Sequence, residues 1–149
     1  MNKINTKLVD IPDEISLKYC ADVIKRGGTV AFPTETVYGL GADGLNSGAV
    51  EKIFIAKGRP NDNPLILHIH DISVLDKYVK EVPKTLTVLS KLYMPGPLTV
   101  VLKKRSIVPD SVTANLDTVA IRVPDNEIAL KLIEYSDTAI AAPSANISG

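Results

Sequence analysis

Short apolar runs of four or five residues recur along the chain, and each is nearly continuous rather than alternating. Runs of this kind are typical of strands that are covered on both faces of a sheet. They predict five strands, at residues 29–32, 65–69, 98–102, 119–123 and 138–142.

Between these runs, apolar residues recur every three or four positions, which predicts helices. The first helix is expected to begin at Pro12 and Asp13, carry Ile15, Tyr19 and Val23 on one face, and end at Gly27 and Gly28. Further helices are predicted over residues 49–57, 71–78 and 83–93, and after a cap at Asp125 or Asn126. Residues 103–118 are polar and without a clear period, and predict a long connecting segment. Alternating strands and helices indicate an α/β domain with a mixed or largely parallel sheet.

The composition agrees with one globular domain spanning residues 1–149, because 45% of the residues are apolar and 23% are charged. No apolar run approaches the roughly 20 residues that cross a bilayer, and the first residues lack a secretion signal. With a single cysteine, Cys20, these features predict a cytoplasmic protein without a membrane partner. Residues 142–149 resemble a loop after a strand, so we expect the domain to continue beyond Gly149.

Charge and metal-ligand content narrow the class of site. The 17 basic and 17 acidic side chains cancel, which argues against a protein that coats nucleic acid but leaves a local basic groove open. One cysteine and two histidines make a structural zinc site very improbable. No metal site is therefore assigned.

Residues 32–41 leave the first strand, pass through a hydroxyl-rich turn and return through two glycines. Loops at strand ends are common ligand sites in α/β folds. Gly39, Gly41 and Gly44 spell G-x-G-x-x-G, but six residues separate them from the strand and no carboxylate follows the next strand. We therefore reject a dinucleotide-binding fingerprint.

Lys57 and Arg59 flank Gly58 at the end of a predicted helix, followed by Pro60. One interpretation is a favourable interaction of cations with the helix dipole. The other is a phosphate clamp in which Arg59 supplies a bidentate fork and Lys57 a point charge. The arginine lies outside the helix, which favours the clamp.

Three further sites, one of them a pair of residues, carry two interpretations each. Arg122 lies in an apolar strand, so its charge needs either an internal carboxylate or the carboxylate of a ligand. His68 is either a half-buried structural histidine or a ligand contact, and it shares a strand face with His70. Ser144 and Asn146 form either a simple turn or a polar loop that approaches a ligand.

Together these segments closely resemble the threonylcarbamoyl-AMP synthase family, whose domain is called YrdC-type. Five motifs match in order across nearly the whole chain: residues 33–40, residues 57–60 with 63–65, residues 95–99, residues 122–124 and residues 143–149. The resemblance implies a twisted mixed α/β sheet flanked by helices, with a concave basic groove. It also implies that this domain is truncated at its C-terminal end.

The family joins L-threonine, bicarbonate and ATP into threonylcarbamoyl-adenylate and releases pyrophosphate, and other proteins transfer the product to tRNA. The resemblance implies catalytic roles for Lys57 and Arg59. It implies that Thr36, His68, Arg122 and Ala142 hold threonine. It implies that ATP is contacted by Lys57, Arg59, Asn63, Thr118, Ser144 and Asn146. Mg²⁺ is expected on the triphosphate, held by phosphate oxygens and water. The alternatives are an RNA-binding module of the same fold without catalysis and a carbamoyl-transferring relative.

Overall fold

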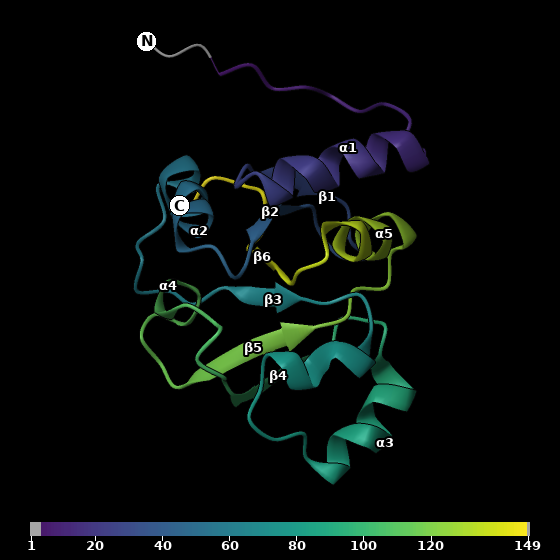
Figure 1. Ribbon diagram of the computed structural model, residues 1–149, viewed down its shortest axis with the longest axis vertical. Helices are drawn as coiled ribbons and strands as arrows, with labels where there is room; N and C mark the ends of the chain where they lie inside the picture. The colour runs from purple at the N-terminus through teal and green to yellow at the C-terminus, as the bar shows by residue number, and fades with distance from the viewer. Residues whose placement is uncertain (1–3, 149) are drawn as a thin grey trace.

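The computed structural model describes residues 4–148 and contains a six-stranded sheet with strand order β1-β2-β6-β3-β5-β4 (Figure 1). The strands are β1 (Val30–Phe32), β2 (Gly39–Asp43), β3 (Ile66–His68), β4 (Thr99–Lys103), β5 (Thr118–Arg122) and β6 (Ile140–Ala142). Only β3 and β5 pair in parallel, and the other pairs are antiparallel. The expected mixed sheet is confirmed, although it is largely antiparallel.

The helices are α1 (Glu14–Lys25), α2 (Ser47–Lys57), α3 (Lys84–Tyr93), α4 (Asp110–Thr113) and α5 (Glu127–Ser136), with a 3-10 helix η1 (Ile72–Lys77). The caps confirm their starting points. The Asp13 carboxylate accepts from the Ser16 N–H, and the Asn126 side chain accepts from the Ala129 N–H. The short α4 lies within the connecting segment for which no helix was predicted.

Strand β2 is the main element that the pattern missed, because its glycines were read as a turn. Gly41 is glycine for a packing reason. A Cβ there would lie 2.6 Å from Ile140 Cγ2 and 2.7 Å from Phe32 Cε1. The missing side chain lets β1 and β6 pack their apolar side chains over β2.

Two apolar cores lie against the sheet. One contains Leu67 and Ile121 from β3 and β5 and packs against α2, α4 and η1. The other contains Phe32 and Ile140 from β1 and β6 and packs against α1 and α5. Figure 1 shows α1 and α5 together at the β1–β2–β6 side of the sheet, away from β4.

The second core leaves part of one sheet face partly exposed. His68 pairs with Ile140 and with Arg122, so these residues point to the face that α1 and α5 cover elsewhere. On this face, Thr99, which pairs with Arg122, and Ile66 and Ala120, which lie farther along, are only half-buried. Their neighbours Leu67 and Ile121 on the other face are fully buried. We call this half-covered area of β3, β4 and β5 the open face.

Candidate functional site

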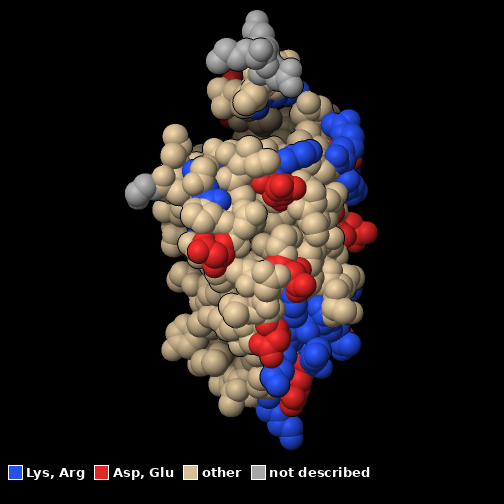
Figure 2. Space-filling view, turned by 90° about the vertical axis from the view of Figure 1, so that its left-hand side faces the viewer, with Lys and Arg blue, Asp and Glu red and all other residues tan. Residues whose placement is uncertain are grey.

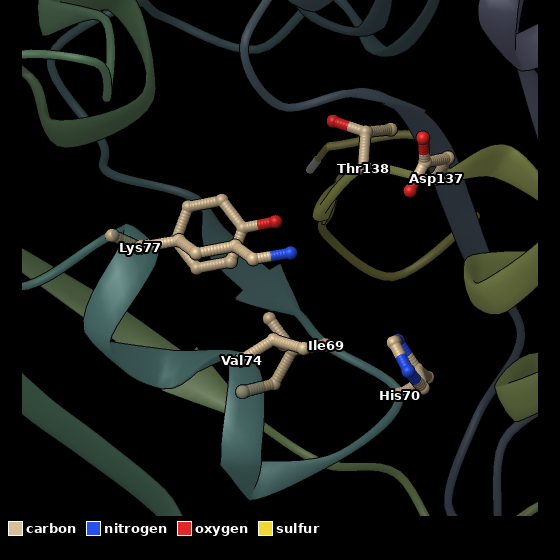
Figure 3. A pocket seen from close by; sticks show the side chains of 7 residues that line it. Ile69, His70, Val74, Lys77, Asp137 and Thr138 are labelled. Carbon is tan, nitrogen blue, oxygen red and sulfur yellow. The ribbon is translucent and has the colours of Figure 1, made fainter.

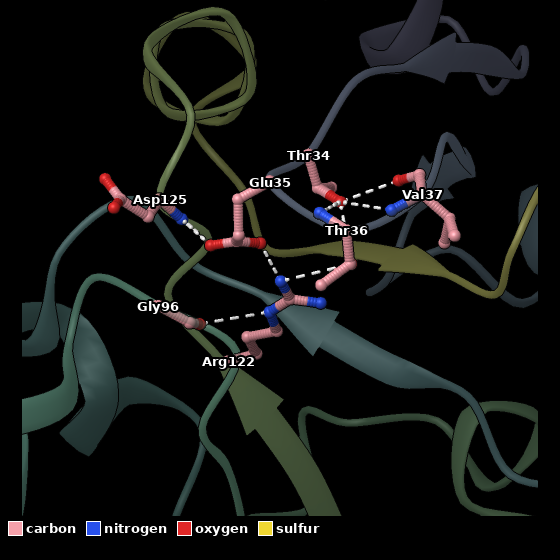
Figure 4. A network of polar contacts seen from close by, with 7 residues as sticks. All are labelled: Thr34, Glu35, Thr36, Val37, Gly96, Arg122 and Asp125. Atoms are coloured by element: carbon pink, nitrogen blue, oxygen red, sulfur yellow. Dashed lines mark hydrogen bonds and ion pairs between the residues drawn. The ribbon is translucent and has the colours of Figure 1, made fainter.

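Arg122, the last residue of β5, lies at one end of the open face and is 9% exposed. Its Nε donates a 3.1 Å hydrogen bond to the Gly96 carbonyl, and its Nη2 donates to a carboxylate oxygen of Glu35 (Figure 4). Burial lowers the pKa of the guanidinium below its usual value. The sequence left open whether an internal carboxylate or a ligand satisfies Arg122, and the structure shows an internal one.

Residues 33–38, which we call the hydroxyl loop, bring Glu35 and Thr36 to Arg122. The Thr36 hydroxyl lies 3.5 Å from Arg122 Nη2. Thr34 shapes this turn, because its hydroxyl donates to the Val37 carbonyl at 2.6 Å and accepts from the Thr36 and Val37 N–H groups at 3.2 Å. The loop thus places the predicted residues Thr36 and Arg122 side by side.

His68 lies beside Arg122 across the β3–β5 pair and is 4% exposed. Its ring packs edge-on against Phe32 at a centroid distance of 5.9 Å, and its Nδ1 lies 3.2 Å from the Ile66 carbonyl oxygen. Burial lowers the pKa of His68 to about 4, so the imidazole is neutral at pH 7. It can form hydrogen bonds to a ligand but supplies no charge.

Ala142 and Thr118 lie farther along the same face from Arg122, with Ala142 level with Ala120, two residues before Arg122, and Thr118 beyond it. Ala142 pairs with Ile66 of β3. Thr118 begins β5, four residues before Arg122, which corresponds to about 13 Å along the strand. Thr118 therefore lies on the face of Arg122 but not beside it.

Lys57, Ser144 and Asn146 form a second cluster. The Lys57 ammonium donates to the carbonyls of Ser144 and Asn146 at 2.5 and 2.6 Å. Lys57 is 3% exposed, and burial, with the nearby Arg59 charge, lowers the pKa of its amine. The Lys57 side chain thus holds the loop after β6 by hydrogen bonds to the backbone oxygens of that loop.

The same loop is also tied to the hydroxyl loop. The Ala145 N–H donates to the Tyr38 carbonyl at 2.8 Å, and Ser144 forms a β-bridge with Gly39. The hydroxyl loop therefore contacts both predicted clusters: Thr36 lies at Arg122, and Tyr38 bonds the loop that Lys57 holds.

Arg59 follows Gly58, which ends α2 in the left-handed conformation with φ 60°. Arg59 Nη2 donates to the Pro64 carbonyl at 3.1 Å and lies 3.5 Å from the Asn63 carbonyl oxygen. Its Nε is buried and has no partner among the described residues. Arg59 and Asn63 are therefore neighbours through the Asn63 backbone.

Sequence reasoning missed two partners of Arg122. Glu35 lies within the motif at residues 33–40, but the sequence assigned it no role. The second partner, the Gly96 carbonyl, comes from the segment before β4. The need of a buried guanidinium for a carboxylate was the available signal for Glu35. No local pattern links residue 35 to residue 122.

Two cavities lie away from these clusters. The smaller, about 20 Å³, is large enough for one water molecule and is bordered by His70, Lys77 and Asp137 (Figure 3). Figure 2 shows lysine and arginine side chains gathered over the lower part of the molecule. Lys77, Lys80, Lys104 and Arg105 line an open groove of about 700 Å³. The basic groove expected around the predicted site residues remains a prediction.

Residues 4–148 contain neither a candidate metal cluster nor a helix that could span a membrane. No group of three His, Cys, Asp or Glu side chains among them is arranged to hold a metal ion. None of their helices has the length and apolar character needed to cross a membrane.

Comparison with known proteins identifies the family. Residues 22–149 match the Sua5/YciO/YrdC family model, which is described as telomere recombination. The chain therefore belongs to the Sua5/YciO/YrdC family.

Relatives and a solved structure add detail. The chain is 56% identical to the threonylcarbamoyl-AMP synthase of Pyrococcus abyssi, over 92% of this chain and 40% of that protein. It is 50% identical to the threonylcarbamoyl-AMP synthase of Bacillus subtilis, over 95% of this chain and 42% of that protein. The crystal structure of P. abyssi Sua5 complexed with L-threonine matches with a TM-score of 0.90, over 92% of this chain and 40% of that chain. The chain thus spans about two fifths of these relatives.

Proposed function

We propose that residues 1–149 form one catalytic domain of an L-threonylcarbamoyladenylate synthase. The reaction joins L-threonine, bicarbonate and ATP and releases pyrophosphate, which makes the enzyme a nucleotidyltransferase. The main support is the hydroxyl loop, which holds Thr36 beside the buried Arg122. The relatives named threonylcarbamoyl-AMP synthase and the relative crystallised with L-threonine support the same proposal.

L-Threonine would bind at the Arg122 end of the open face. The Arg122 guanidinium would receive the substrate carboxylate through charge-assisted hydrogen bonds. Thr36 supplies a hydroxyl 3.5 Å from the same guanidinium, and the buried, neutral His68 supplies a ring nitrogen. The backbone at Ala142 would complete this site.

ATP would contact Lys57, Arg59, Asn63, Ser144 and Asn146 at the other cluster, and Thr118 on the open face. The threonine amine is first carboxylated, and a carbamate oxygen then attacks the α-phosphorus in line with departing pyrophosphate. Such chemistry depends mainly on positioning and charge stabilisation. Two buried or half-buried cations, Lys57 and Arg59, fit that need. The buried, unpartnered Nε of Arg59 is a free donor within this cluster.

Mg²⁺ is proposed to accompany the triphosphate and to neutralise part of its charge. The described residues offer no acidic cluster for it, so phosphate oxygens and water would be its main ligands. The product is proposed to pass in the cytoplasm to other proteins of the tRNA threonylcarbamoyl-transfer machinery. Direct RNA binding is part of the same proposal.

The deciding experiment measures pyrophosphate release from ATP by this chain. The proposal expects release only when both L-threonine and bicarbonate are present, with threonylcarbamoyl-adenylate as the product. Strong, salt-sensitive RNA binding without such turnover would instead support the RNA-binding alternative. Turnover with carbamoyl phosphate in place of threonine and bicarbonate would support the carbamoyl-transferring alternative.

A further inference from the structure

Glu35 makes two contacts that the proposed substrate contacts do not explain. One carboxylate oxygen accepts from Arg122 Nη2, and the other accepts from the backbone N–H of Asp125 (Figure 4). The first contact reaches the end of β5, and the second reaches the turn before α5. A single carboxylate therefore joins the hydroxyl loop to two segments some ninety residues farther along the chain.

The surroundings favour a strong orienting effect. The side chains of Glu35 and Arg122 are 22% and 11% exposed, so the ion pair is only partly open to water. Such a pair fixes geometry more than it adds net stability, because desolvation offsets much of the attraction. The Gly96 carbonyl holds the Nε side of the same guanidinium. With Nε and Nη2 both bonded, the guanidinium plane has one orientation.

This orientation leaves one edge of Arg122 unused. No hydrogen bond among residues 4–148 involves its Nη1, which carries two N–H donors. The Thr36 hydroxyl lies next to Nη2 on the adjacent side. A carboxylate ligand can therefore bind Arg122 without displacing Glu35.

We propose that Glu35 is a positioning residue for amino-acid recognition. It holds Arg122 so that the two N–H donors of Nη1 receive the carboxylate of the amino-acid substrate, beside the Thr36 hydroxyl. Glu35 stays bonded to Arg122 when that substrate binds. This inference rests on the proposed function, since it takes L-threonine as the ligand.

The test measures the dissociation constant of L-threonine by calorimetry, without ATP, for the wild-type chain and for E35A, E35Q, R122A and the E35A/R122A double variant. E35A is expected to weaken binding about 10-fold or more, the loss expected for a charge-assisted hydrogen bond. E35Q keeps one acceptor oxygen, so its dissociation constant for L-threonine is expected to lie between those of the wild-type chain and E35A. Adding E35A to R122A is expected to change nothing further, because Glu35 acts through Arg122. E51Q, at an exposed glutamate of α2, is the matched control.

The direction of the change separates the outcomes. Tighter threonine binding by E35A would mean that Glu35 occupies the place of the substrate, and would overturn the proposal. Unchanged binding by E35A and E35Q, with a wild-type chain that binds threonine, would also overturn it and leave the proposed function intact. A wild-type chain that binds no threonine would overturn both.

A purely structural role for Glu35 predicts a different pattern. If Glu35 is only structural, E35A would lower the melting temperature and raise the KM values for threonine and ATP together. The positioning role raises the threonine KM while the ATP KM stays within about twofold. If E35A fails to fold, E35Q decides between the two, because it retains the size and one acceptor of the side chain.

Discussion

The ammonium of Lys57, at the end of α2, donates a 2.5 Å hydrogen bond to the carbonyl of Ser144, 87 residues farther along the chain. It also bonds the Asn146 carbonyl, so one buried cation holds the loop after β6 by its backbone. Lys57, which is predicted to contact ATP, thus also supports the loop that carries two other predicted ATP contacts, Ser144 and Asn146.

Replacing Lys57 with methionine is expected to lower adenylate formation about 100- to 1000-fold, the usual cost of losing one well-placed charge-stabilising donor. Hydrogen exchange of residues 143–148 is expected to rise, because their carbonyls lose the ammonium. Lys52→Met is the matched control, since Lys52 lies on the same helix and also bonds a carbonyl, that of Gly27. Wild-type rates in Lys57→Met would contradict a role for Lys57 in the reaction.

Arg59→Ala is expected to lower adenylate formation by a similar factor without unfolding the chain. Its guanidinium bonds only nearby backbone carbonyls and forms no ion pair among the described residues. Steady-state rates and circular dichroism would be measured on the same preparation. A large loss of secondary structure together with the rate would show that Arg59 holds the turn rather than a phosphate.

Arg122→Ala is expected to raise the threonine KM much more than the ATP KM, because its guanidinium lies beside Thr36 and bonds none of the predicted ATP contacts within residues 4–148. It is also expected to destabilise the fold by about 3 kcal/mol, since it leaves the Glu35 carboxylate without its cation. Initial-rate kinetics with each substrate varied in turn would test the first expectation, and urea unfolding the second. Equal rises in both KM values would argue for a structural role only.

His68 predicts a pH dependence of stability. Burial lowers its pKa from 6.5 to about 4, so between these values the unfolded chain binds more protons than the folded chain. The stability contribution is therefore complete above about pH 6.5 and is lost as the pH falls toward 4, by about 3 kcal/mol in total. His68→Gln should remove this component, so the gap between the two proteins in unfolding free energy should narrow from pH 7.5 to pH 4.5. A gap that does not vary with pH would mean that His68 does not carry this effect.

Two glycine substitutions test the packing of β2. Gly41→Ala would place a Cβ 2.6 Å from Ile140 Cγ2 and is expected to cost about 1–3 kcal/mol of unfolding free energy. Gly48→Ala is the matched control, because its nearest neighbour is an Asn46 oxygen at 3.5 Å and it lies in α2. It is expected to be neutral or to stabilise the helix by up to about 1 kcal/mol. Equal effects of both substitutions would contradict the close packing at Gly41.

The spacing of apolar residues was sufficient to predict most helices and strands, because apolar spacing and helix caps are local signals. Asp13 and Asn126 mark helix starts through their own side chains, and both caps are confirmed. Strand β2 was missed because its glycines are demanded by Phe32 and Ile140, which lie elsewhere in the chain. The strand order was equally out of reach, since it depends on long-range pairing.

The candidate site shows the same division. The resemblance named Thr36 and Arg122, which lie together, and Lys57, Ser144 and Asn146, which are hydrogen-bonded. The roles of these residues remain predictions. Glu35 was not chosen, because its two partners follow it by 87 and 90 residues and only the fold brings them together.

The position of β6 has a consequence for how the protein is made. Within residues 4–148, β6 follows the other five strands in sequence, yet it pairs with β2 on one side and β3 on the other. A nascent chain on the ribosome thus holds two unfinished half-sheets until residues 140–142 emerge. Such late, long-range pairing slows folding. The strand that joins the two half-sheets also carries the Ser144–Asn146 loop to Lys57, so the pairing of the half-sheets and the assembly of the candidate nucleotide cluster depend on the same segment.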